Sequence, residues 1–184
     1  MKKATLFLIL QIFTISLFAQ INTDRVLAIG RNALYFEDYV LSIQYFNQVI
    51  KSKPWLAEPY FYRAVAKINL DDFKGAEEDC TLCLQRNPFL TQAYYARGIA
   101  RQSQEKYDEA IAFFDEAIEM NPSFAKAYSE RGRAKNLKGD KTGAFEDLKK
   151  SLELNPESEE AQKMNGQHSN FDDMYKGGIF DSPF

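Results

Sequence analysis

Two cysteines, Cys80 and Cys83, stand in a C-x-x-C spacing, which in other proteins marks redox or metal chemistry. A metal site would need further ligands, and the only histidine, His168, lies near the end of the sequence. A redox pair would be expected at the start of a helix with one thiol exposed. Both cysteines instead fall on one side of a predicted helix, in positions that are apolar elsewhere in the chain. We therefore predict that they pack in the core, with a regulatory disulfide as the alternative.

No set of catalytic residues accompanies the cysteines. The serines are scattered, and neither a nucleophile nor a carboxylate is positioned with His168. The acidic pairs Asp71–Asp72 and Glu159–Glu160 fall at a turn and at a helix start, where the helix dipole stabilises a negative charge. The sequence also lacks a glycine-rich phosphate-binding loop. We predict a protein that is not an enzyme and that uses neither a cofactor nor a metal.

Composition narrows the partner class further. The 184 residues include 23 basic and 26 acidic side chains, which gives a net charge of -3. No basic field is available to hold a nucleic-acid backbone, so we exclude nucleic acid as a partner. Hydrophobic residues make up 45% of the chain, which is too many for a disordered protein and enough for a sizeable core.

Arginines recur at a fixed spacing, at Arg63, Arg97 and Arg131, and Asp79 and Asp147 follow two of them by sixteen residues. This offset places each arginine on one helix and the aspartate on a facing helix. We predict that Arg63 pairs with Asp79 and that Arg131 pairs with Asp147. The alternative is a ladder of arginines that binds an anionic partner.

The spacing of the arginines belongs to a period of 34 residues that runs through the chain, as the prolines Pro54, Pro88, Pro122 and Pro156 show. Each period holds two amphipathic stretches separated by a polar turn. Small residues recur where the two helices of a hairpin must cross, at Gly30, Ala64, Gly98 and Gly132. We predict stacked helix hairpins, with repeats at 23–56, 57–90, 91–124 and 125–158.

This pattern resembles the tetratricopeptide repeat family. In residues 91–122 the family's large, small and stop positions are held by Tyr94, Gly98, Tyr107, Ala110, Phe114, Ala117 and Pro122. The resemblance implies an all-α fold, a right-handed superhelical solenoid of helix-turn-helix repeats. It also implies a concave groove, lined by the first helices, that binds peptides or partner proteins. The sequence departs from the pattern locally, at Val26, Cys80 and Lys141.

The resemblance assigns the groove to residues of the four first helices. They are Leu27, Arg31, Leu34, Phe61, Val65, Ile68, Tyr95, Ile99, Gln102, Ser129, Arg133 and Asn136. The middle of this strip is apolar and aromatic, which suits a peptide with apolar anchors. The alternative is that Phe61 and Tyr95 only pack against neighbouring helices.

One known mode of recognition in the family is absent from this sequence. Some chaperone-binding members hold the terminal carboxylate of a peptide with lysines, asparagines and an arginine. The matching positions here are Leu27, Arg31, Tyr62, Gln92 and Ala96. We do not expect this kind of recognition.

Both ends of the chain differ from the repeats. Residues 1–19 have the layout of a secretory signal peptide that is cut after Ala19, with an uncleaved membrane anchor as the alternative. Residues 159–166 predict a short polar helix that caps the fourth repeat, and residues 167–184 predict a mobile tail. The tail could lie in the groove through its apolar residues, Phe171, Tyr175, Ile179, Phe180 and Phe184.

The sequence therefore predicts an exported adaptor or scaffold of the cell envelope, located in the periplasm or outside the cell, which binds a partner protein or peptide and could also self-associate. Two other functions stay open. One is an accessory or regulatory subunit of an envelope enzyme or assembly machine, with its own tail in the groove. The other is a binder of a lipid or small apolar ligand between Phe61 and Tyr95.

Overall fold

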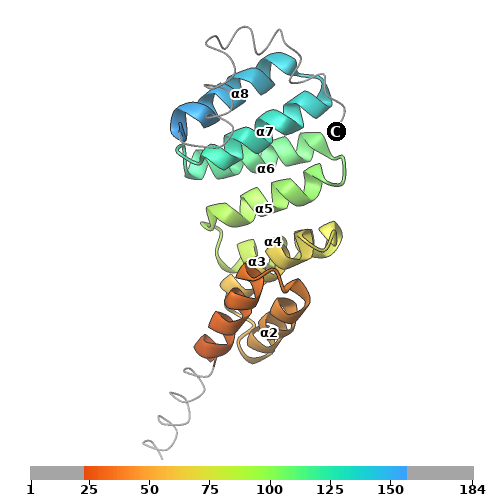
Figure 1. The fold of residues 1–184 in the computed structure, drawn as a ribbon, viewed down its shortest axis with the longest axis vertical. Coiled ribbons are helices and arrows are strands. Elements are labelled where there is room, and N and C mark those ends of the chain that lie inside the picture. The colour runs from red at the N-terminus through yellow and green to blue at the C-terminus, as the bar shows by residue number, and fades with distance from the viewer. Residues whose placement is uncertain (1–22, 157–184) are drawn as a thin grey trace, which may run out of the picture. The chain divides into compact units, whose positions relative to one another are not determined.

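The computed structural model describes residues 23–156, and every regular element within that range is an α-helix, as predicted. Helical residues 23–35 come first. The helices that follow are α2 (Tyr39–Ser52), α3 (Glu58–Ile68), α4 (Phe73–Arg86), α5 (Thr91–Gln102), α6 (Tyr107–Met120), α7 (Ala125–Lys138) and α8 (Lys141–Leu154) (Figure 1). The chain divides into two compact units, one ending at Pro88 and the other beginning at Phe89.

The turn between the two helices of each hairpin has the same backbone conformation every 34 residues. A left-handed residue occupies it each time, at Glu37, Asp71, Glu105 and Gly139, with φ of 61°, 59°, 61° and 100°. Only the last of these is glycine, for which this conformation carries no steric penalty. An aspartate follows three of them, at Asp38, Asp72 and Asp140. Its side chain accepts a hydrogen bond from a backbone N–H in the first turn of the next helix, donated by Leu41, Gly75 and Gly143 respectively.

Each second helix has its C-cap at the residue before a proline. Asn87, Asn121 and Asn155 are the C-caps of α4, α6 and α8, and all three leave the helical conformation with φ of -139°. A following proline clashes with a helical conformation at the preceding residue, which explains these ends. The next hairpin can therefore begin only a few residues later.

The core of the first unit lies between α2, α3 and α4. Phe46 and Ala64 are fully buried, and Cys80 and Cys83 are buried and are not joined in a disulfide. Burial raises the pKa of the Cys83 thiol to about 11, although a backbone hydrogen bond with Phe61 opposes this shift. The Cys83 thiol therefore stays protonated at neutral pH, and both cysteines are packed in the core, as predicted.

The core of the second unit is built by α5, α6, α7 and α8. Ala110, Phe114 and Ala134 form one buried cluster. Gly98 lies so close to this cluster that a Cβ atom there would stand 2.5 Å from Cε1 of Phe114. The close approach of α6 to α5 therefore requires a small residue at position 98, as predicted.

Three predicted segments lie outside the described residues: the signal peptide at 1–19, the capping helix at 159–166 and the tail at 167–184. Within residues 23–156, no helix combines the length and the apolar character needed to cross a membrane.

Candidate functional site

Arg63 ties three helices of the first unit together. From α3, its Nε donates to Oδ2 of Asp79 on α4 at 2.8 Å, and its Nη1 donates to Oδ1 of Asn47 on α2 at 2.6 Å. Lys67 adds a second cation, with its Nζ 2.8 Å from the same carboxylate. Asp79 is only 1% exposed, so the two cations compensate a buried charge.

Arg131 repeats this arrangement in the second unit. Its Nε donates to Oδ2 of Asp147 on α8 at 2.8 Å, and its Nη1 donates to Oδ1 of Asp115 on α6 at 2.6 Å. Lys135 lies 2.8 Å from Asp147. Burial opposes the charge of Arg131, but the hydrogen bonds to Asp147 and Asp115 outweigh it and raise the pKa of the guanidinium. Both predicted arginine–aspartate pairs are therefore confirmed.

Arg97 holds the equivalent position on α5, where Phe113 replaces the aspartate. Its guanidinium carbon lies 4.2 Å from the centroid of the Phe113 ring, which is a cation–π geometry. All three arginines thus contact groups on neighbouring helices of their own units. Helix packing within each repeat therefore explains why the three arginines recur at a fixed spacing.

The predicted face of the first unit is half-buried. This holds for five of its six residues, Leu27, Leu34, Phe61, Val65 and Ile68. The sixth, Arg31, is exposed, and its guanidinium lies 5.4 Å from the centroid of the Tyr62 ring and 3.7 Å from Oε1 of Glu58. The face therefore presents apolar side chains beside one cation.

Tyr95 is the centre of the predicted face in the second unit. Its ring lies 5.9 Å from that of Phe114 and 5.1 Å from that of Phe124, measured between centroids. Burial raises the pKa of Tyr95 to about 12, and the nearby carboxylate of Glu130 adds to the shift. The hydroxyl therefore stays protonated at neutral pH, where it can donate a hydrogen bond. Tyr95 both packs and remains half-buried, so the two interpretations of this residue are compatible.

The other predicted residues of the second unit lie on α5 and α7. Ile99 packs against the cluster of Ala110, Phe114 and Ala134, and Asn136 is half-buried. The Nε2 of Gln102 donates to Oε2 of Glu130 at 3.0 Å. Arg133 is 63% exposed at its side chain, and its Nη1 lies 3.2 Å from Oε1 of Glu130.

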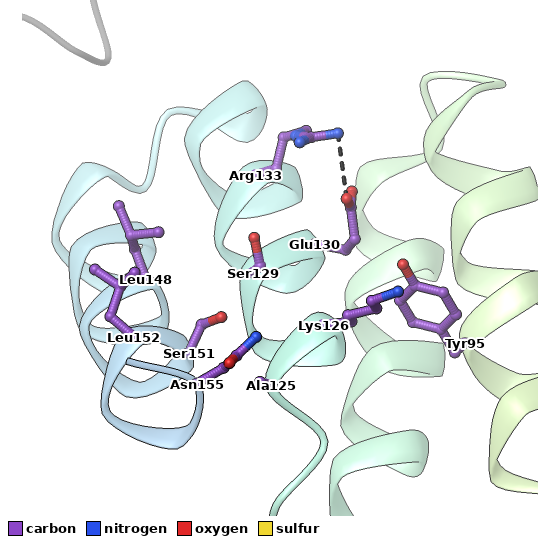
Figure 2. A pocket seen from close by; sticks show the side chains of 10 residues that line it. All are labelled: Tyr95, Ala125, Lys126, Ser129, Glu130, Arg133, Leu148, Ser151, Leu152 and Asn155. Carbon is purple, nitrogen blue, oxygen red and sulfur yellow. Dashed lines mark ion pairs between the residues drawn. The ribbon is translucent and has the colours of Figure 1, made fainter. Parts of the chain in front are cut away.

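A pocket of about 270 Å³ brings three of the predicted residues together, Tyr95, Ser129 and Arg133. Figure 2 shows Tyr95 of α5 on one side of it and Leu148 and Leu152 of α8 on the other, with α7 between them. The remaining lining residues are Ala125, Lys126, Glu130, Ser151 and Asn155.

Of the ten lining residues the groove prediction contained three, and the charged residues that it missed are Lys126 and Glu130. Together with Arg133 they follow one another at four and three residues along α7, a spacing that places side chains on one face of a helix. That spacing was visible in the sequence. The position of this face beside Tyr95, however, depends on how α7 packs against α5 and α6. The pocket therefore combines two cations, one carboxylate, two hydroxyl-bearing serines and an aromatic hydroxyl.

The groups that line this pocket are charged, polar and aromatic. Among the described residues, no group of three or more histidine, cysteine, aspartate or glutamate side chains is arranged to hold a metal. The available functions are hydrogen-bond donation, charge pairing and contact with an aromatic ring.

Comparison with known proteins places the helix hairpins in a family. Residues 91–124 and residues 125–158 each match a family model described as a tetratricopeptide repeat. No curated protein matches the chain by sequence.

Solved structures share the fold. A crystal structure of MamA is similar with a TM-score of 0.67 and 22% identity, over 80% of this chain and 82% of that one. The tetratricopeptide repeat domain of Arabidopsis OM64 has a TM-score of 0.61 and 27% identity, over 63% of this chain and 96% of that one. The first such domain of RPAP3 (Spaghetti), solved with the HSP90 peptide SRMEEVD, has a TM-score of 0.62 and 25% identity, over 64% of this chain and 93% of that one.

A repeated helix hairpin accounts for these matches. It also accounts for the period of 34 residues, the small residues where the helices cross and the turns at each Asn-Pro pair. Residues 91–158 are two tetratricopeptide repeats, and the described chain shares the fold of a solved tetratricopeptide repeat domain.

Proposed function

We propose that the protein is a non-enzymatic adaptor that binds a peptide segment of a partner protein on the exposed side of its first helices. The observation that carries this proposal is the pocket beside Tyr95, where a half-buried aromatic residue on α5 adjoins the charged face of α7. Peptide sites commonly join one aromatic anchor to a few polar groups that fix orientation.

The comparisons support a peptide as the ligand. Two similar domains, the first and second of RPAP3, were solved with the HSP90 peptide SRMEEVD and the HSP70 peptide SGPTIEEVD. The positions that form a carboxylate clamp in such domains are Leu27, Arg31, Tyr62, Gln92 and Ala96 here, and Arg31 is the one cationic side chain among them. We therefore propose a different peptide sequence as the ligand.

The pocket indicates what that sequence would contain. The Tyr95 hydroxyl and the ammonium of Lys126 are donors on its rim, and the guanidinium of Arg133 is largely exposed. Glu130 is already engaged by Gln102 and Arg133. The net positive rim favours a peptide with an acidic side chain next to an apolar anchor, since the carboxylate can accept hydrogen bonds from these donors.

The test selects peptides from a random library on the mature chain and measures their affinity for three variants. Tyr95→Phe removes only the hydroxyl and is expected to weaken binding about fivefold. Lys126→Glu is expected to weaken it about tenfold or more, because it puts a carboxylate against the acidic side chain. Lys149→Glu, at an exposed position of α8 outside the pocket, is the matched control and should have no effect. Equal losses in all three variants, or no loss at Tyr95 and Lys126, would refute the proposed site.

Export to the cell envelope also remains a proposal, based on residues 1–19. Mass spectrometry of the N-terminus of the protein from its native cells would test it. A mature chain that begins at Gln20 supports export, whereas an intact Met1 supports an anchor or an unexported protein.

A further inference from the structure

The hairpin turns of the first unit expose large apolar side chains to water. In the first turn Tyr35 is 81% exposed and Phe36 is 77% exposed, and their rings contact each other edge to face. Val40, in the first turn of α2, is 59% exposed. A fully exposed aromatic side chain presents about 200 Å² of surface. The two rings alone therefore leave about 300 Å² in water, which is the size at which an apolar patch is often functional.

The two units stack their repeats in the same way. In the first unit, Nη1 of Arg63 on α3 donates to Oδ1 of Asn47 on α2 at 2.6 Å. Two periods later, Nη1 of Arg131 on α7 donates to Oδ1 of Asp115 on α6, also at 2.6 Å. A pair of residues that bridges α6 and α7 therefore indicates which positions of α2 and α3 are neighbours.

One such pair lies at the turns. Lys138, the last residue of α7, forms an ion pair with Asp108 in the first turn of α6. The positions two periods earlier are Leu70 and Val40, so the register places Leu70, which is 43% exposed, beside Val40 on the same edge of the first unit. The first unit thus has an apolar pair where the second unit has a charged one. We define the turn patch as the exposed apolar residues of these two turns, which are Tyr35, Phe36, Val40, Leu41 and Leu70.

The rim of the turn patch is acidic. Each turn has a left-handed acidic residue followed by the aspartate that caps the next helix, at Glu37–Asp38 and at Asp71–Asp72, and all four are exposed. Lys74 is the only cation in the sequence of residues 35–41 and 69–75. The cations one turn earlier, Arg31 and Lys67, are paired with carboxylates of their own unit. The rim therefore carries a net negative charge.

This charge discriminates between possible occupants. A second copy of the chain would bring the same carboxylates against the rim, and an anionic lipid surface would bring phosphates, so like charges oppose both. We propose that the turn patch binds a basic amphipathic segment of a partner protein. The apolar side chains of that segment cover Tyr35 and Phe36, and its lysines or arginines meet the acidic rim. Aromatic anchors surrounded by a polar rim are common at protein interfaces.

The proposal does not depend on the pocket beside Tyr95. The turn patch lies on the first unit and selects a basic partner, whereas the pocket lies on the second unit and its cations select an acidic one. The protein would then hold two partner segments of opposite charge.

The probe for the turn patch is a synthetic amphipathic helical peptide with leucine on one face and lysine on the other. The reference peptide has glutamate in place of every lysine. The lysine peptide should bind the purified chain and the glutamate peptide should not. Tyr35→Ser combined with Phe36→Gln should weaken binding about tenfold or more, because both aromatic anchors are removed. The third repeat carries serine and glutamine at these positions, in a turn with the same left-handed φ, so the fold tolerates them.

Three further variants test charge and location. Glu37→Lys should weaken binding of the lysine peptide about threefold at low salt and less at high salt. Leu137→Ser is the matched control, because Leu137 is 49% exposed and holds the position of Tyr35 in the fourth repeat, and it should have no effect. Lys126→Glu, in the pocket beside Tyr95, should not weaken binding, which separates this result from that of the proposed function.

Several outcomes would overturn the proposal. They are equal binding of the two peptides, unchanged affinity in the Tyr35→Ser, Phe36→Gln variant, and an equal loss in Leu137→Ser. A dimer in sedimentation, or binding to phosphatidylserine vesicles, that is lost in the double variant would also overturn it, because the occupant would then be a second copy or a membrane. Far-UV circular dichroism checks that each variant is folded. Hydrogen exchange needs no variant: the lysine peptide should slow exchange at residues 35–41 and 69–72 of the unaltered chain, and unchanged exchange there would refute the proposed surface.

Discussion

Arg131 contacts two carboxylates that differ in burial, and this allows a sharp test of how the hairpins are held. Asp147 is 4% exposed and is shared by Arg131 and Lys135, whereas the side chain of Asp115 is 53% exposed. The perturbation is Asp147→Asn compared with Asp115→Asn. Each change keeps the size of the side chain and removes one carboxylate charge that contacts Arg131.

The two changes should differ greatly in cost. Asp147→Asn leaves two cations, on side chains that are 17% and 22% exposed, without their common counter-charge, and such a change costs about 3 kcal/mol. Asp115→Asn removes a solvated ion pair, which is worth about 0.5 kcal/mol. The difference of about 2.5 kcal/mol corresponds to a factor of roughly 70 in the unfolding equilibrium constant.

The assay is urea denaturation followed by far-UV circular dichroism, at low and at high salt. Salt should reduce the small effect of Asp115→Asn and leave that of Asp147→Asn nearly unchanged, because buried charges are poorly screened. Costs that agree within about 0.5 kcal/mol would refute the argument from burial. So would a cost below about 1 kcal/mol for Asp147→Asn, since the contact would then be no stronger than a surface pair.

Three further predictions concern stability. The pKa of Cys83 is 9 in the unfolded chain and about 11 in the folded chain, so the unfolded chain loses its thiol proton first as the pH rises. The free energy of unfolding should therefore fall between about pH 9 and pH 11. Titrated denaturation should show a loss of about 2 kcal/mol, and Cys83→Ala should remove that part of the slope. Gly98→Ala should cost about 2 kcal/mol in thermal unfolding, because the new methyl group meets the buried ring of Phe114; an unchanged Tm would contradict this. Asp140→Ala should cost about 1 kcal/mol by loss of the α8 cap at Gly143, and a stability equal to wild type would show that water replaces it.

Much of the fold was predictable because its signals are local and repeated. The hairpin predicted in the first repeat, 23–56, is observed as the helical residues 23–35 and α2 (Tyr39–Ser52). The turn conformation was not predictable in three of four hairpins. Glu37, Asp71 and Glu105 adopt positive φ without being glycine, and only Gly139 carried a visible signal.

The candidate site was predicted less completely. The family resemblance pointed to Tyr95, Ser129 and Arg133, and all three line one pocket. Lys126 and Glu130 were missed, because their relevance depends on which face of α7 lies beside α5. The binding role of the face on both units is still a prediction.

The sequence by itself determined the period, the helix ends and the pairing of Arg63 with Asp79 and of Arg131 with Asp147. Each follows from residue type and spacing within or between adjacent helices. Only the tertiary structure decided that Arg131 also reaches Asp115 on a third helix, and that Glu130 lies near enough to Tyr95 to help hold its hydroxyl protonated. The physical reason is that the burial and the direction of a long side chain depend on which helices surround it. The spacing of residues along the sequence does not specify those neighbours.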